Sequence, residues 1–159
     1  MAERRKTKID ISKNNALMIA KILNQTLADL SDLFTQLKQA HWNLQGANFI
    51  ALHKFFDELA EEVEKAVDIV AERAVTLGYP AEGTARMAAA SSRLPEFKSG
   101  FISDKNSIKL LIDRYALIAK NVRAAIEESE SYGDLITADL FIDLGAMLDK
   151  SLWFLESHI

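Results

Sequence analysis

The residues of this chain that suggest chemistry begin in the segment HWNLQGANFIALHKFFDEL, residues 41–59. It holds two of the three histidines, His41 and His53, and Asp57 follows the second by four positions. Side chains four apart on a helix lie on one face, so His53 and Asp57 would stack. Imidazole and carboxylate without sulfur, in a chain that has no cysteine, suit iron, manganese or zinc. The segment therefore indicates one wall of a metal site, although His41 taken alone also fits a core histidine bonded to a carbonyl.

A second pair with the same spacing, Asp68 and Glu72, lies eleven residues beyond Asp57. Eleven residues are close to three helical turns, so both pairs face nearly the same way, about 16 Å apart along the axis. Metal ligands lie only about 2.0–2.6 Å from the ion, so one straight helix cannot bring both pairs to one metal. Two antiparallel copies crossing near residues 62–63 would place each His53/Asp57 pair opposite the other copy's acidic pair. The spacing permits this twofold arrangement without requiring it, and a charged helix face remains the alternative.

Four long amphipathic helices must position these residues. Apolar side chains recur at alternating steps of three and four, the period of one helix face. His41 continues the apolar stripe of the first helix, so we expect it at the buried edge. Asp104 and Asp134 are predicted to be the N-caps of the last two helices. The expected helices cover roughly residues 14–43, 47–77, 104–131 and 134–157.

The connections between these helices predict an all-α fold. Short links make consecutive helices antiparallel neighbours, while residues 78–103 form a long crossover with a short helix expected at residues 84–92. A four-helix bundle with one long crossover between its second and third helices is the ferritin-like arrangement. At 159 residues we expect a single bundle domain at 13–159, preceded by a basic flexible arm at 1–12.

The charge distribution is uneven and raises the question of nucleic-acid binding. The net charge is −4, yet residues 1–8 carry Arg4, Arg5, Lys6 and Lys8 against one acid, which leaves the remainder at −7. Such an arm can neutralise DNA phosphates without sequence preference, or be an ordinary solvated terminus. No secretory signal and no membrane-spanning stretch is expected, and the lack of cysteine fits a reducing cytosol.

Several segments together resemble the Dps family, the DNA-binding proteins from starved cells, also called mini-ferritins. They are residues 41–59, DIVAERAVTLG at 68–78, DRYALIAKNVRAAI at 113–126 and LDKSLWFLES at 148–157, so the resemblance covers nearly the whole chain. It implies twelve four-helix subunits in a hollow shell, with ferroxidase sites between twofold-related subunits. His41, His53 and Asp57 match the ligands of one subunit, and Asp68 and Glu72 match the acids of its partner.

The resemblance implies an activity as well. By this resemblance, one or two Fe(II) ions would bind at the dimer seam, be oxidised preferentially by hydrogen peroxide, and enter the cavity as Fe(III) mineral, which would protect DNA in oxidative stress. Two alternatives remain: a nucleoid-compacting DNA-binding protein with a secondary iron site, and a helical oligomer whose seam residues are structural. A full-size ferritin fits less well, because no histidine has a glutamate three residues before it.

Three further residues have two readings each. Trp42, next to His41, could intercept a stray oxidising equivalent or merely pack at the end of its helix. Asp139 and Asp143, four apart on the last helix, are candidates for an acidic iron-entry pore, or part of a solvated face.

Overall fold

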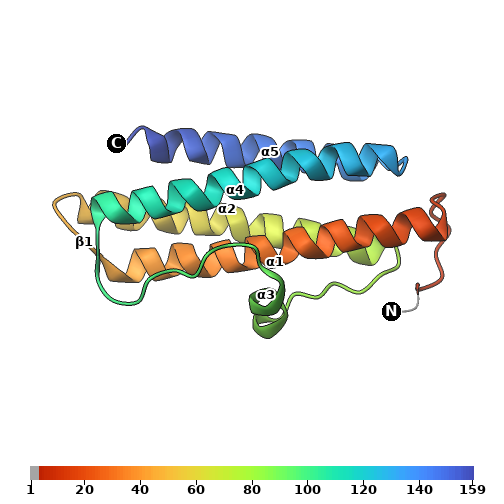
Figure 1. Ribbon diagram of the computed structural model, residues 1–159, viewed down its shortest axis with the longest axis horizontal. Coiled ribbons are helices and arrows are strands. Elements are labelled where there is room, and N and C mark those ends of the chain that lie inside the picture. Colours follow the sequence, from red (N-terminus) through yellow and green to blue (C-terminus); the bar gives the residue numbers. More distant parts are fainter. Residues whose placement is uncertain (1–3) are drawn as a thin grey trace.

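Four long helices lie side by side and form the body of the protein (Figure 1). The computed structural model describes residues 4–159. All four predicted helices are confirmed, each ending within two residues of its expected bounds. No helix in the described part is long and apolar enough to cross a membrane. The long helices are α1 (Lys13–Asn43), α2 (Phe49–Thr76), α4 (Asp104–Ser131) and α5 (Leu135–Glu156).

The bundle is built from two hairpins, because short links force consecutive helices to run antiparallel. α1 packs mainly against α2, and α4 mainly against α5. Apolar stripes of all four helices meet in one core, in which Leu30, Phe56, Tyr115 and Phe141 are fully buried. His41 lies at the edge of this core, 9% exposed, as its place in the apolar stripe predicted.

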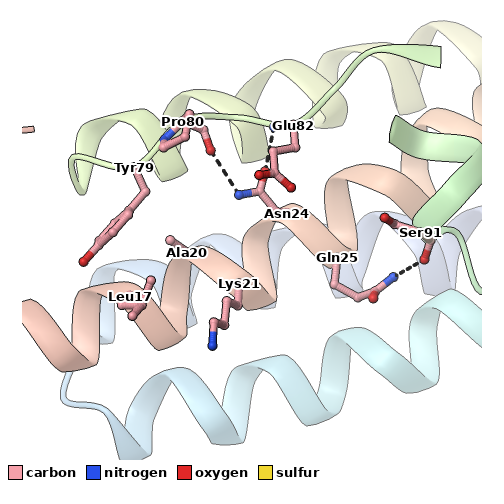
Figure 2. A pocket seen from close by; sticks show the side chains of 9 residues that line it. All are labelled: Leu17, Ala20, Lys21, Asn24, Gln25, Tyr79, Pro80, Glu82 and Ser91. Carbon is pink, nitrogen blue, oxygen red and sulfur yellow. Dashed lines mark hydrogen bonds between the residues drawn. The ribbon is translucent and has the colours of Figure 1, made fainter. Parts of the chain in front are cut away.

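The long crossover runs from the end of α2 to the start of α4 and carries α3 (Ala85–Ser91), the expected short helix (Figure 1). It is tied to α1 by amide side chains: Asn24 donates to Pro80 O at 3.1 Å, and Gln25 donates to Ser91 O at 2.8 Å (Figure 2). The pocket drawn in Figure 2 is lined by these four residues and five others, and none of the nine is a predicted metal ligand.

Of the two predicted helix N-caps, one is confirmed and the other is wrong. Asp134 caps α5, accepting from Thr137 N as predicted. The predicted N-cap at Asp104 is wrong, since Asp104 is the first residue of α4 and the hydroxyl of Ser103 accepts from Asn106 N instead. The helix therefore begins where predicted, but the shorter hydroxyl side chain caps it.

The sequence did not indicate two very short strands, one after α1 and one before α4. β1 (Leu44–Gln45) follows α1 and β2 (Ile102–Ser103) precedes α4, and the two pair in parallel. Two residues are too few to show an alternating pattern, so only the folded chain reveals this pairing.

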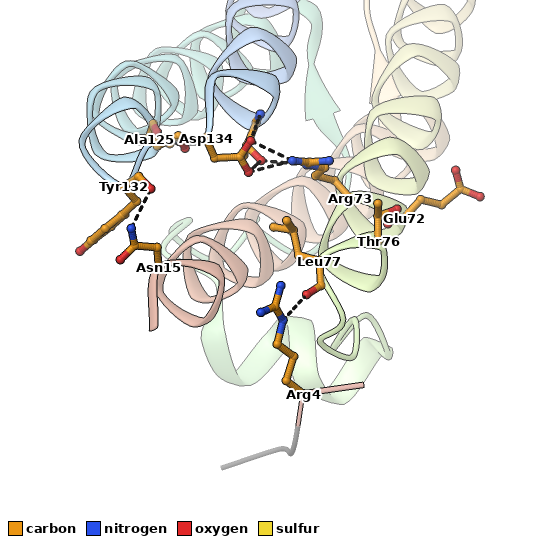
Figure 3. Close-up of polar contacts among 11 residues, drawn as sticks. Arg4, Asn15, Glu72, Arg73, Thr76, Leu77, Ala125, Tyr132 and Asp134 are labelled. Carbon is orange, nitrogen blue, oxygen red and sulfur yellow. Dashed lines mark hydrogen bonds and ion pairs between the residues drawn. The ribbon is translucent and has the colours of Figure 1, made fainter. Parts of the chain in front are cut away.

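A buried ion pair joins the two hairpins at the opposite end of the bundle (Figure 3). The Arg73 guanidinium on α2 donates to both carboxylate oxygens of Asp134, at 2.8 and 2.9 Å, and to Thr137 Oγ1 at 2.8 Å. The two charged side chains are 11% and 1% exposed. Burial opposes ionisation of Asp134, but the hydrogen bonds from Thr137 and Arg73 outweigh it and hold the pKa of Asp134 below its ordinary value.

We expect Asp134→Asn to lower the free energy of unfolding at pH 7 by about 2–4 kcal/mol, because it leaves a buried guanidinium without its counter-charge. Since the folded pKa is lowered, this contribution is complete at neutral pH. It is lost as the pH falls below the ordinary carboxyl value of 3.8 toward the folded pKa. Urea unfolding at pH 7 and near pH 3 measures the difference, which should narrow at the lower pH.

The matched control is Asp149→Asn, which breaks the exposed Arg123–Asp149 pair, whose side chains are 58% and 45% exposed. An exposed pair contributes only about 0–1 kcal/mol, so this variant should unfold nearly like the wild type. Equal losses in the two variants would contradict a special role for the buried pair.

Candidate metal site

The two histidines of the opening segment meet where α1 ends and α2 begins. The α1–α2 hairpin brings His41 and His53 into face-to-face contact, with ring centroids 3.7 Å apart and planes 19° from parallel. The two rings are close because the short link between α1 and α2 makes the helices antiparallel, so the end of α1 lies beside the start of α2. The structure thus brings together two of the five predicted ligands within one chain.

Each histidine is held by the backbone of the other. His41 Nδ1 lies 2.7 Å from His53 O, and His53 Nδ1 lies 3.0 Å from His41 O. A carbonyl oxygen only accepts, so both rings must carry their proton on Nδ1. In the neutral form of each ring the lone pair able to bind a metal is then on Nε2, and neither Nε2 makes a hydrogen bond within residues 4–159. This arrangement is typical of metal-binding histidines, in which a second-sphere carbonyl fixes the tautomer and the ring.

The same contacts also complete the end of α1. His41 O belongs to the last turn of that helix, where carbonyls have no partner in the helix itself. His53 Nδ1 supplies a donor for that carbonyl. The pairing therefore stabilises the hairpin whether or not a metal is bound, so the two readings of His41 are compatible.

Asp57 lies one turn beyond His53 on α2 and forms an ion pair with Lys38 of α1. The hydrogen bond from the Lys38 ammonium holds the pKa of the Asp57 carboxyl below its ordinary value. Asp57 is therefore ionised at neutral pH, and 44% of its side chain is exposed, so a cation can reach it. Lys38 was not among the predicted site residues, although its position three residues before His41 places both side chains on the same face of α1.

Asp68 and Glu72 are exposed on α2, far along the helix from the histidines. Figure 3 shows the Glu72 side chain pointing away from the neighbouring Arg73–Asp134 pair. Among residues 4–159, no three His, Asp or Glu side chains lie close enough to hold a metal ion. A single chain thus carries a histidine pair and, elsewhere, an acidic pair, and the five-ligand set stays a prediction.

The remaining predicted site residues are all at the surface. Trp42 is 64% exposed, so it does not pack into the core of its own chain. Asp139 and Asp143 are exposed on α5 and line a groove against α2 with Glu62. Their role in an iron-entry pore stays a prediction.

The basic arm lies in part against the end of α2. The Arg4 guanidinium donates to Leu77 O at 3.0 Å (Figure 3), and Arg5 N donates to Gly78 O at 2.7 Å. Gly78 has a φ of +94°, and a Cβ there would lie 2.8 Å from Arg5 O, so only glycine fits this contact. Lys6 and Lys8 are exposed. The first three residues of the predicted arm lie outside the described part of the chain, and its boundary at residue 12 stays a prediction.

The roles of the two histidine nitrogens can be separated by substitution. His41→Asn retains a short side-chain donor for His53 O but has no Nε2 ligand, whereas His41→Ala loses both. We expect His41→Ala to lower the free energy of unfolding by about 1–3 kcal/mol and His41→Asn to lose clearly less, because the carbonyl keeps a partner. Both should lose metal binding. Urea unfolding at one fixed protein concentration and a metal titration measure the two effects. Equal destabilisation by Ala and Asn would contradict the assigned hydrogen bond.

Comparison with known proteins shows which family the chain belongs to. The ferritin-like domain family matches residues 20–159. The chain is 39% identical over 154 residues to the DNA protection during starvation protein of Agrobacterium fabrum, covering 97% of this chain and 95% of that protein.

Solved structures agree with this assignment. The tetragonal form of Mycobacterium smegmatis Dps superposes with a TM-score of 0.91 at 30% identity, covering 99% of this chain and 94% of that one. DpsC from Streptomyces coelicolor superposes with a TM-score of 0.94 at 29% identity, covering 98% and 91%. Both the predicted ferritin-like fold and the resemblance that the sequence motifs suggested are confirmed. This chain belongs to the Dps family of ferritin-like proteins.

Proposed function

We propose that this protein is a ferroxidase that binds Fe(II) between two twofold-related copies and oxidises it, preferentially with hydrogen peroxide. The observation that carries the proposal is the reciprocal hydrogen bonding of His41 and His53. It leaves two imidazole Nε2 atoms free and places the ionised Asp57 carboxylate one turn away. Nitrogen and carboxylate ligands of this kind suit iron, and they also suit manganese and zinc, so oxidation itself must be measured.

The second half of the site is proposed to come from Asp68 and Glu72 of a partner chain. Along α2, Asp57 and Asp68 are separated by about 16 Å, far beyond the reach of one coordination sphere. Both acids are exposed in the single chain and therefore available to a second copy. A twofold interface uses the same surface of each chain twice, so one dimer would hold two identical sites.

The proposed reaction oxidises two Fe(II) ions, because reduction of one hydrogen peroxide to water takes two electrons. Two Fe(II), one hydrogen peroxide and two protons give two Fe(III) and two water molecules, and peroxide is reduced by two electrons without releasing hydroxyl radical. Carboxylates such as Asp57, Asp68 and Glu72 stabilise the higher charge of Fe(III). Twelve subunits would enclose the Fe(III) mineral in a shell, and acidic residues such as Asp139 and Asp143 would lead iron inward.

The biological role proposed here is protection of DNA against iron and peroxide in the bacterial cytoplasm, close to the nucleoid. Its support is the relationship to the Agrobacterium fabrum protein, whose name refers to DNA protection during starvation. Removing Fe(II) and peroxide together removes both reactants that generate hydroxyl radical. Such protection does not require the shell to bind DNA.

Complementation between two inactive variants tests the shared site. His41→Ala/His53→Ala lacks the histidine half and Asp68→Ala/Glu72→Ala lacks the acidic half, so each alone should oxidise Fe(II) with peroxide at the background rate. Co-expressed at equal levels, about half of the dimers would be mixed, and each mixed dimer would contain one complete site. We expect roughly a quarter of the wild-type activity to return, measured as Fe(III) absorbance after adding stoichiometric peroxide.

The control for this experiment puts all four substitutions in one chain and co-expresses it with the wild type. Its mixed dimers hold no complete site, because each site lacks one half. Recovery in the complementation that does not exceed background would show that the site is not shared between chains. Wild-type rates in the histidine variant alone would contradict the ferroxidase proposal itself.

DNA binding through the N-terminal arm is a second proposed function, supported by the exposure of Lys6 and Lys8. Arg4 and Arg5 donate side-chain hydrogen bonds to carbonyls around the end of α2, which leaves the two lysines as the main phosphate contacts. The rest of the chain is acidic and would repel DNA, so binding must come from the arms of several copies acting together. It should be independent of sequence and weaken steeply with salt.

We expect Lys6→Ala/Lys8→Ala to bind duplex DNA at least about tenfold more weakly than the wild type at low salt, because phosphate contacts are lost. The matched control is Lys105→Ala/Lys109→Ala, which removes two exposed lysines from α4. Gel shifts at a series of salt concentrations measure both. Unchanged binding by the arm variant would show that the arm does not carry DNA binding.

A further inference from the structure

We propose that Lys38 is an internal competitor for the metal at Asp57: its ammonium group occupies the carboxylate until a divalent cation displaces it. Lys38 thereby sets the Fe(II) concentration at which the site fills. The inference rests on the proposed metal site, and it gives Lys38, which is not itself a ligand, control over the affinity of that site for a divalent cation.

The first support is the contact itself. Lys38 reaches from α1 to α2 and pairs with Asp57 Oδ1, and its side chain is only 23% exposed. Asp57 is the one predicted ligand of the histidine half that carries a negative charge. A metal that used Asp57 together with the two Nε2 atoms would bring a double positive charge close to the Lys38 ammonium. The two cations repel each other, so metal binding must weaken or break the ion pair.

The second support is an aromatic ring close to the ammonium on the same helix. Trp42 lies one turn after Lys38 on α1, and its ring centroid is 5.9 Å from Lys38 Nζ while Nζ is paired with Asp57. A lysine ammonium over an indole face is stabilised by the ring quadrupole. A groove lined by Lys38, Thr35, Gln39 and Trp42 lies on this side of α1. The flexible lysine side chain can therefore leave Asp57 by a small rotation and still keep a favourable contact.

The competition and a purely structural role of Lys38 predict different changes in metal affinity when the charge of Lys38 is removed. If Lys38 only tied α1 to α2, neutralising it would loosen the hairpin and weaken metal binding or leave it unchanged. If Lys38 competes with the metal, neutralising it removes a cost of binding and the metal binds more tightly. A partly exposed ion pair of this kind corresponds to roughly a three- to tenfold change in affinity.

The experiment uses the full-length protein and titrates it with Co(II), which does not oxidise under these conditions and reports its ligands through visible absorption. Calorimetry gives the dissociation constant. Lys38→Met keeps the length of the stem without the charge, and we expect it to bind Co(II) roughly three- to tenfold more tightly than the wild type. Lys38→Arg keeps the charge and should retain weak binding near that of the wild type.

Lys54→Met is the matched control. Lys54 follows His53 directly, is exposed, and forms no ion pair within residues 4–159, so removing its charge tests the general effect of one cation nearby. We expect its affinity for Co(II) to stay within about twofold of the wild type, because exposed charges are screened. The apparent KM for Fe(II) should fall in Lys38→Met and not in this control.

The outcomes separate the competition from the site on which it rests. Affinity in Lys38→Met that is equal to or weaker than in Lys54→Met would overturn the competition, and Lys38→Gln provides a second neutral variant to confirm either result. Co(II) binding that survives His41→Ala/His53→Ala unchanged would instead show that the proposed site is wrong. Loss of Co(II) binding in the histidine variant, with tighter binding in Lys38→Met, supports both.

Discussion

The reciprocal hydrogen bonding of His41 and His53 is the interaction on which the candidate site depends. Each ring donates from Nδ1 to the other residue's carbonyl, so one arrangement closes the α1–α2 hairpin, satisfies a carbonyl in the last turn of α1 and leaves both Nε2 atoms free. Ligand geometry and hairpin stability therefore have the same cause. A hairpin formed correctly already has its metal-binding tautomer, and no further ordering of the rings is needed when a cation arrives.

The spacing of the predicted ligands along α2, a single helix from Phe49 to Thr76, supplies the second constraint. A rigid helix keeps the histidine end and the acidic end of the predicted ligand set apart by about 16 Å, which no motion of side chains can close. Any metal that uses both ends requires a second chain, so metal binding and association become linked equilibria. A metal bound at such a seam would stabilise the dimer, and the dimer would in turn raise the affinity for the metal.

Charged residues in this protein serve different purposes according to their burial. Arg73 and Asp134 are buried, bidentate and locked by Thr137, and they hold the two hairpins together. Lys38 and Asp57 are partly exposed, which makes their pair strong enough to compete with a cation and weak enough to be displaced. Arg4 and Arg5, which looked like free DNA-binding cations, donate to carbonyls around the end of α2. Lys6 and Lys8 of the basic cluster are exposed and make no side-chain hydrogen bond within residues 4–159.

The sequence by itself determined the helices, their antiparallel order, the ferritin-like arrangement and the burial of His41, because the period of the apolar residues and the lengths of the links leave little choice. It also singled out the two histidines and Asp57 by spacing within one segment. Only the tertiary structure decided which nitrogen of each histidine is free, that Lys38 pairs with Asp57, and that Ser103 rather than Asp104 caps α4. It also showed Arg4 and Arg5 at the end of α2. The physical reason is one of range: periodicity and capping act within a few residues, whereas these contacts join side chains to groups on other elements, and their geometry exists only after the helices have packed.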